Sequence, residues 1–265
     1  MKNLSRTALA LVLGLSWAAP FVRADEPAKT ETPAKPVAPK DEPSVPSVKG
    51  NPDDPKNGFL KRHEGFLKDK EELLKKGPIQ LVFIGDSITD GWRGAKGKEV
   101  FNSNYSQYNT YNIGISGDRT QHVLWRIDHG ELDGLEPNPK AAMLMIGTNN
   151  LGPNPSNEAI ADAVTKIVQD IHQKLPKTKV LLLAIFPRGA AADNPFRARI
   201  KAINETLAKL DDGGKSVKYL DIGDNFLDKD GSLPKDVMPD ALHPNAKGYG
   251  IWADAVKPAL DELMK

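Results

Sequence analysis

The chain has 265 residues, of which 39% are hydrophobic and 27% charged, and its formal net charge is +1. This length accommodates one α/β domain with extensions, or two small domains. The near balance of acidic and basic residues lacks the basic excess of nucleic-acid-binding proteins, so we expect no nucleic-acid partner. The chain has no cysteine, which excludes a thiol nucleophile, a disulfide and a cysteine-ligated metal.

Residues 1–24 are typical of a cleaved signal peptide. Lys2 and Arg6 precede an apolar stretch over residues 8–19, and residues 22–24 place small side chains where a cleavage after Ala24 requires them. The apolar stretch is short for a membrane span, and an uncleaved N-terminal anchor is the alternative. We therefore expect a secreted or periplasmic protein without stable membrane insertion.

Residues 25–56 have the composition of an extended, disordered linker. They contain eight prolines among Lys, Glu, Asp, Thr and Ala, with almost nothing apolar to bury. A plain spacer is the usual role of such a segment, and a tether to the cell wall is the alternative. The folded domain is therefore expected to cover residues 57–265.

Within that domain, helical and apolar segments alternate. In chain order, the pattern predicts a helix from Phe59 to Gly77, a strand over 80–84, a weaker strand over 108–113, a helix over 120–131 with Thr120 as its N-cap, a strand over 141–146, a helix capped by Ser156, a strand over 180–186, a helix over 196–207, a strand over 217–222, and a last helix opened by Pro244. Strands that are apolar throughout and alternate with helices indicate an α/β fold with a parallel sheet covered on both faces. Sites in such sheets form beyond the carboxyl ends of the strands.

The first predicted strand is followed by Gly85, Asp86 and Ser87. Taken alone, this is a strand-to-helix turn with polar caps, which is the commoner meaning of so short a motif. In the functional interpretation, Ser87 is a nucleophile whose hydroxyl projects from the edge of the sheet. The motif is not the Gly-x-Ser-x-Gly elbow of the α/β-hydrolases.

Two further loops offer groups that can donate hydrogen bonds to an oxyanion. After the second strand, Gly114 and Gly117 permit positive φ and close backbone approach. An ordinary turn explains them equally, and a phosphate loop is disfavoured because no Gly-Lys-Ser/Thr follows. After the third strand, Asn149 and Asn150 either stabilise their loop or present a side-chain amide to a developing oxyanion.

Asp240 and His243 lie three residues apart near the C-terminus. This spacing lets the carboxylate reach the imidazole Nδ1, which leaves Nε2 free as a base. Pro244 holds His243 in an extended conformation. An Asp-x-x-His is common by chance. The remaining histidines fall in predicted helices, where we expect structural or solvated roles: His63, His122, His129 and His172.

Together these motifs resemble the four ordered blocks of the SGNH (GDSL-type) hydrolase superfamily, over residues 57–265. The matching residues are Gly85-Asp86-Ser87, Gly117, Asn149 and Asp240-x-x-His243. Within the superfamily, residues 112–126 and 147–150 are most similar to the catalytic subunits of intracellular platelet-activating factor acetylhydrolase.

The resemblance implies a flavodoxin-like, three-layer α/β/α fold with a five-stranded parallel sheet. It implies a catalytic triad of Ser87, His243 and Asp240, and no metal or cofactor. It also implies an oxyanion hole formed by the backbone N–H groups of Ser87 and Gly117 and the side chain of Asn149.

The expected signal peptide and proline-rich segment distinguish this chain from those intracellular enzymes. We therefore expect a secreted serine esterase that forms an acyl-enzyme on short-chain esters, with acetylated carbohydrates as candidate substrates. A lipid or phospholipid acyl hydrolase is the first alternative, although no long apolar insertion separates the blocks. A non-catalytic carbohydrate-binding module is the second, and it is disfavoured because nucleophile and base are both present. The sequence leaves the oligomeric state open.

Overall fold

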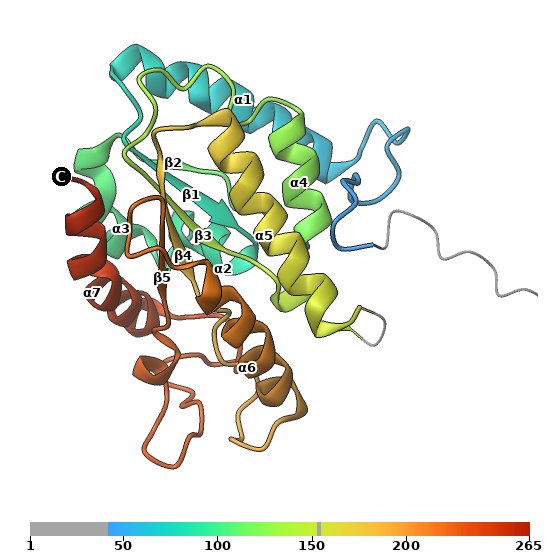
Figure 1. Cartoon of the computed structure of the whole chain (residues 1–265), viewed down its shortest axis with the longest axis vertical. Helices are drawn as coiled ribbons and strands as arrows, with labels where there is room; N and C mark the ends of the chain where they lie inside the picture. The colour runs from blue at the N-terminus through green and yellow to red at the C-terminus, as the bar shows by residue number, and fades with distance from the viewer. Residues whose placement is uncertain (1–41, 153–154) are drawn as a thin grey trace, which may run out of the picture. The chain divides into compact units, whose positions relative to one another are not determined.

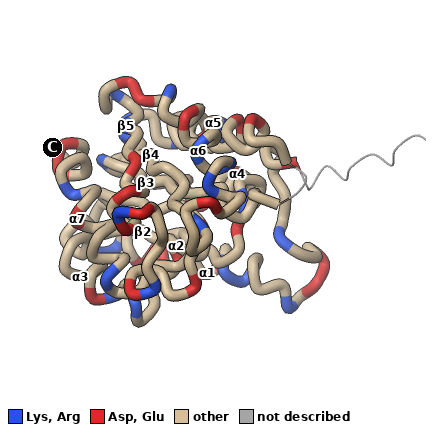
Figure 2. Tube along the Cα trace, turned by 90° about the horizontal axis from the view of Figure 1, so that it is seen from below, with Lys and Arg blue, Asp and Glu red and all other residues tan. Residues whose placement is uncertain are grey.

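The computed structural model describes residues 42–152 and 155–265 (Figure 1). The expected signal peptide and residues 25–41 of the expected linker lie outside the described residues. No helix in the described part is long and apolar enough to cross a bilayer. Figure 2 shows Lys and Arg interspersed with Asp and Glu along the chain, rather than gathered by sign.

A five-stranded parallel sheet forms the centre of the domain. Its strands are β1 (Leu81–Gly85), β2 (Tyr111–Asn112), β3 (Ala141–Met145), β4 (Lys179–Leu183) and β5 (Val217–Leu220). They lie in the order β2-β1-β3-β4-β5, and every neighbouring pair is parallel. The strand order reverses between β1 and β3, and sheets of this kind open a crevice at that point, beyond the carboxyl ends of the strands. The expected α/β fold is confirmed.

Alternate side chains of each strand face opposite layers of helices. Val82 and Ile84 belong to one hydrophobic cluster, whereas Leu81 and Phe83 belong to the other. Four helices cover the face of Val82 and Ile84: α1 (Gly58–Lys76), α4 (Thr120–Asp128), α5 (Asn157–Lys174) and α6 (Pro195–Leu207). Three helices cover the face of Leu81 and Phe83: α2 (Ser87–Asp90), α3 (Lys98–Tyr105) and α7 (Ala246–Leu263). In Figure 1, the sheet is seen between α4 and α5 on one side and α3 and α7 on the other.

Several boundaries differ from the sequence-based expectation, among them the end of α4 at Asp128 and the end of β4 at Leu183. The second strand is only two residues long, and it starts late because Asn109 adopts a left-handed φ of 47° and turns the chain just before it. Thr120 is the first residue of α4 rather than its cap, and its hydroxyl donates to the Pro43 carbonyl. The last helix is capped by Asn245, whose Oδ1 accepts from the Gly248 N–H over 3.1 Å, so Pro244 precedes the cap.

Residues 42–56 differ from the expected free linker, because they pack along the domain. We call residues 42–57 the N-terminal strap. The Ser47 N–H donates to the Gln121 carbonyl over 3.1 Å, and the Pro43 carbonyl accepts from the buried Thr120 hydroxyl over 2.8 Å. Prolines lack an N–H but keep a carbonyl acceptor, and a buried hydroxyl requires a partner. The strap thereby satisfies polar groups at the start of α4.

Candidate active site

Three polar side chains form a hydrogen-bonded chain at the carboxyl edge of the sheet. Ser87 is the first residue of α2, directly after β1, and its Oγ lies 2.9 Å from Nε2 of His243. Nδ1 of His243 lies 2.7 Å from Oδ2 of Asp240. A carboxylate at Nδ1 favours the tautomer with the proton on that nitrogen, which leaves Nε2 as an acceptor facing the Ser87 hydroxyl. The structure therefore brings together all three predicted triad residues.

The turn from Asp240 to His243 is shaped by its own backbone. Oδ1 of Asp240 accepts from the N–H groups of Leu242 and His243, over 3.2 and 2.8 Å, while Ala241 adopts a left-handed φ of 56°. The Ala241 carbonyl accepts from the Gly189 N–H over 2.9 Å, which ties this turn to the loop after β4. Partial burial raises the pKa of the Asp240 carboxyl, but the hydrogen bonds and charge of His243 outweigh it and hold that pKa below its ordinary value.

Ser87 sits on a tightly packed turn. A Cβ on Gly85 would stand 2.4 Å from the Met145 carbonyl oxygen, so only glycine fits between β1 and β3 here. Asp86 caps α2 by accepting from the Ile88 N–H over 3.0 Å. Its carboxyl is fully buried, and Oδ2 has no hydrogen-bond partner. Burial raises the pKa of Asp86 to about 7.

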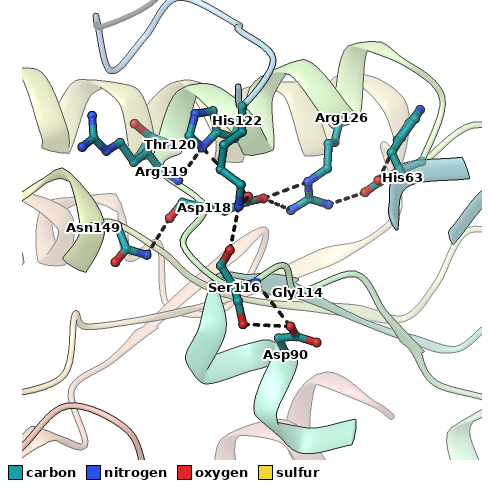
Figure 3. Close-up of polar contacts among 12 residues, drawn as sticks. His63, Asp90, Gly114, Ser116, Asp118, Arg119, Thr120, His122, Arg126 and Asn149 are labelled. Atoms are coloured by element: carbon teal, nitrogen blue, oxygen red, sulfur yellow. Dashed lines mark hydrogen bonds and ion pairs between the residues drawn. The ribbon is translucent and has the colours of Figure 1, made fainter. Parts of the chain in front are cut away.

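Two of the three predicted oxyanion donors, Gly117 and Asn149, lie on neighbouring loops, and the third, the Ser87 N–H, lies at the start of α2. Gly117 belongs to the β2–α4 loop, residues 113–119, where its φ of +77° favours glycine. Asn149 follows β3, and its Nδ2 donates to the Asp118 carbonyl over 2.8 Å (Figure 3). An amide nitrogen carries two hydrogens, so the second N–H of Asn149 remains available for a ligand. The Asp118 carbonyl therefore fixes the Asn149 amide beside Gly117.

A buried ion network lies behind this loop. Nε of Arg126 donates to Oδ2 of Asp118 over 3.0 Å, and its NH1 donates to Glu131. Nδ1 of His63 lies 2.8 Å from Glu131, which extends the network to α1 (Figure 3). Asp118, Arg126 and Glu131 are fully buried. Burial lowers the pKa of Arg126, but its two carboxylate partners outweigh burial and hold it above its ordinary value. The network thus anchors the β2–α4 loop through the side chain of Asp118.

Comparisons with known proteins decide the family. A sequence model of the GDSL-like lipase/acylhydrolase family matches residues 83–251. The chain belongs to this family. Platelet-activating factor acetylhydrolase IB subunit alpha1 of Homo sapiens is 32% identical over 206 residues, which cover 78% of this chain and 84% of that protein. The alpha2 subunit of the same enzyme from Mus musculus is 31% identical over 207 residues, which cover 78% of this chain and 84% of that protein.

Solved structures share the fold of this GDSL-type hydrolase. A GDSL-like lipase from Bacteroides thetaiotaomicron has a TM-score of 0.55 at 20% identity, covering 76% of this chain and 98% of that one. A variant of an acetyl-xylooligosaccharide esterase from Geobacillus Stearmophilus has a TM-score of 0.53 at 20% identity, covering 69% and 93%. Family membership makes the protein an ester hydrolase.

In this GDSL-type hydrolase, three of the other four histidines have structural partners, whereas Nε2 of the fourth, His172, is buried without a hydrogen-bond partner among the described residues. His63 pairs with Glu131, and His129 stacks on Trp125 with ring centroids 3.7 Å apart. Nδ1 of His122 accepts from the Arg119 N–H over 3.0 Å, and burial lowers the pKa of His122 to about 3. These three imidazoles are therefore committed to packing and hydrogen bonding.

Sequence reasoning missed the residues that hold the β2–α4 loop. Arg126 lies within the stretch that carries the family resemblance, so that stretch contained a signal for it. Glu131 and His63 become partners only when α1 packs beside α4, and no spacing along the chain indicates that contact.

Proposed function

We propose that this GDSL-type acylhydrolase is an exported serine esterase that cleaves short-chain esters, acetyl esters above all, with Ser87, His243 and Asp240 as its triad. One observation carries the proposal. The two hydrogen bonds that join these side chains, at 2.9 and 2.7 Å, have the geometry of an activated nucleophile.

The reaction follows from this geometry in two steps. Ser87 Oγ bonds to the ester carbonyl carbon while Nε2 of His243 takes the Ser87 proton, and Asp240 stabilises the imidazolium. The N–H groups of Ser87 and Gly117 and the amide of Asn149 stabilise the oxyanion. The carbon–oxygen bond to the alcohol then breaks, and the alcohol leaves with the proton from His243. Water, deprotonated by the same imidazole, then attacks the acyl carbon. The bond to Ser87 Oγ breaks, Ser87 regains its proton from His243, and the acid is released.

Two features support an acetyl ester as substrate. The segment after β4, residues 187–195, is rich in Gly, Ala, Asp and Asn, and is more polar than a lipid-binding groove. A cavity of about 510 Å³ lies between α6 and β5, and its lining includes Ile200 and Tyr219 but neither Ser87 nor His243. This cavity therefore offers no acyl channel that opens directly on the nucleophile.

The N-terminal sequence supports an extracytoplasmic substrate. A signal peptide over residues 1–24 would deliver the enzyme to a compartment where acetylated glycans occur, and one structural neighbour is an acetyl-xylooligosaccharide esterase. The second candidate is a lipid acetyl ester, favoured by the relatives named platelet-activating factor acetylhydrolase. Both candidates share the acetyl group and differ in the alcohol.

The test is kcat/KM for p-nitrophenyl acetate, butyrate and octanoate, followed by acetylated xylooligosaccharides against an acetylated phospholipid. A small acyl site predicts a fall from acetate to octanoate. An apolar channel would instead raise kcat/KM by up to about fourfold per added methylene, the equivalent of about 0.8 kcal/mol. A rise towards octanoate would contradict the acetylesterase. Absence of labelling by a fluorophosphonate would contradict an activated serine and favour a non-catalytic binding module.

A further inference from the structure

A lysine of the N-terminal strap reaches the loop that carries Gly117. Nζ of Lys49 donates to the Ser116 carbonyl over 2.6 Å and to Oδ1 of Asp118 over 3.0 Å. The ammonium thus binds the residues on both sides of Gly117. A Cβ on Gly117 would stand 3.7 Å from Nζ. Lys49 precedes the residues 83–251 that define the family match, so that match assigns it no role.

The contact with Ser116 bears directly on the Gly117 N–H. The Ser116 carbonyl and the Gly117 N–H belong to one planar peptide unit, and in a trans peptide they point in opposite directions. An ammonium on the carbonyl oxygen therefore fixes the direction of the N–H. It also polarises the peptide, and a polarised peptide is a stronger donor, as hydrogen bonds in a chain strengthen one another.

Gly117 needs such a restraint. It is exposed and lacks a side chain, so its backbone has wide conformational freedom. From the opposite side, Oδ2 of Asp90 accepts from the Ser116 N–H over 3.2 Å and from its hydroxyl over 3.0 Å. Asp118, the second partner of Lys49, has a carbonyl that orients Asn149. The Lys49 ammonium therefore contacts both residues that position the predicted donors on these loops: Ser116, whose peptide carries the Gly117 N–H, and Asp118, whose carbonyl orients Asn149.

The strap holds Lys49 in place by contacts along its length. Nδ2 of Asn57 donates to the carbonyls of Lys49 and Asn51, over 3.0 and 2.8 Å, and Val48 packs against the hydrophobic core. Nζ of Lys49 lies 5.7 Å from the centre of the Phe59 ring, at the start of α1. The lysine is therefore positioned by the fold and is not a freely rotating surface side chain.

We propose that Lys49 is a positioning residue for catalysis, which orients and polarises the Ser116–Gly117 peptide so that the Gly117 N–H faces the oxyanion. The inference deepens the proposed function and rests on it, because it takes Gly117 as an oxyanion donor. The N-terminal strap is then part of the active site's support.

The test compares Lys49→Met, which keeps the apolar stem and removes the ammonium, with Lys49→Arg, which keeps the charge and the donors. We expect Lys49→Met to lower kcat for p-nitrophenyl acetate at least about tenfold. This is less than the fall in kcat of about 10² to 10³ that follows the loss of a whole oxyanion donor. KM should change less than twofold, and the rate of fluorophosphonate labelling should fall in parallel. Lys49→Arg should recover most of the activity.

The matched control is Lys61→Met, an exposed lysine on α1 whose activity should equal that of the wild type. A normal kcat in folded Lys49→Met, or a change confined to KM or to the melting temperature, overturns the inference. Lys49→Gln provides a second uncharged variant with the same outcomes should Lys49→Met fail to fold. Ser87→Ala distinguishes failure of the proposed function from failure of the Lys49 inference. An active Ser87→Ala protein overturns the proposed function. An inactive Ser87→Ala protein with a fully active Lys49→Met protein overturns only the role of Lys49.

Discussion

The two halves of the active site are held in opposite ways. The Asp240 and His243 side chains are 58% and 36% exposed, and a turn of four residues positions them. The β2–α4 loop is held instead by Asp118 and Arg126, whose side chains are both 0% exposed. Hydrogen bonds within the turn and one contact with the loop after β4 hold the first half, whereas the second depends on long-range contacts with α1, α4 and the N-terminal strap.

The difference follows from what each half does in the proposed reaction. The imidazole must exchange protons with the substrate and water, which requires access to solvent. The oxyanion donors must already point at the place where charge develops, since reorientation during the reaction would cost part of their effect. Buried charges with several partners provide such rigidity. Changes in the exposed half should therefore reduce activity without loss of stability, whereas changes in the buried half should mainly reduce stability.

The largest expected effect comes from the nucleophile. Ser87→Ala should lower kcat by about 10⁴ to 10⁶, because the proposed acyl-enzyme has no other acceptor. The melting temperature should stay within a few degrees of the wild type, because one half-buried hydroxyl contributes little packing. Hydrolysis of p-nitrophenyl acetate and thermal unfolding measure the two effects. Ser103→Ala, on the exposed face of α3, is the control. Substantial turnover by a folded Ser87→Ala protein would contradict the triad.

The exposed carboxylate gives the next largest effect. Asp240→Asn should lower kcat by about 10⁴, because an amide no longer favours the tautomer in which Nε2 is the base. Stability should hardly change. Asp236→Asn removes a neighbouring exposed carboxylate, which pairs with Lys247, and should leave kcat unaltered. Equal losses in both variants would mean that general charge in this turn, rather than orientation of His243, supports the reaction.

The buried half should respond mainly in stability. Arg126→Met should reduce the free energy of unfolding by about 3–5 kcal/mol, because it removes the buried cation that Asp118 and Glu131 share. Lys201→Met, which breaks an exposed ion pair with Glu205, should have little effect. Urea unfolding measures both. A small loss in Arg126→Met would show that the network is not what holds the β2–α4 loop.

Asn149 lies between the halves and should affect the rate more than the fold. Asn149→Ala should lower kcat by about 10² to 10³ while KM changes little, because the amide is proposed to bind the oxyanion rather than the ester ground state. Steady-state kinetics separate the two parameters. An effect confined to KM would reassign Asn149 to substrate binding. Asn150, which is buried and donates to Thr120 and Gln121, should instead lower stability when replaced by Ala.

The last expected effect is a pH dependence of stability from Asp86. Its pKa rises from an ordinary 3.8 to about 7, so between these values the folded protein holds a proton that the unfolded chain has lost. The resulting stabilisation is fully present below the lower value and disappears as the pH rises through the upper one.

Asp86→Asn should remove this dependence. Relative to the variant, the wild-type free energy of unfolding should fall by up to about 1.4 kcal/mol per pH unit between pH 4 and 7. Urea unfolding of both proteins at half-unit intervals tests this slope. A constant difference between them would mean that Asp86 is ionised throughout.

The sequence by itself determined the alternation of strands and helices, because apolar runs and helical periodicity are local signals. It also determined the Asp240–His243 pair, since three residues of spacing are enough for a carboxylate to reach an imidazole. It misplaced the limits of β2 and the cap of α7, where Asn109 and Asn245 impose local geometry that periodicity does not record.

Only the tertiary structure decided how the parts of the site meet. Ser87 and His243 lie 156 residues apart in the chain, and the order of the parallel strands brings them within hydrogen-bond distance. Composition predicted an extended, disordered linker up to residue 56, but the strap contacts the start of α4. There the Gln121 carbonyl accepts from the Ser47 N–H, and the buried Thr120 hydroxyl donates to the Pro43 carbonyl. The reach of Lys49 to the peptide before Gly117 spans 67 residues of sequence, and no pattern along the chain records a contact that packing alone creates.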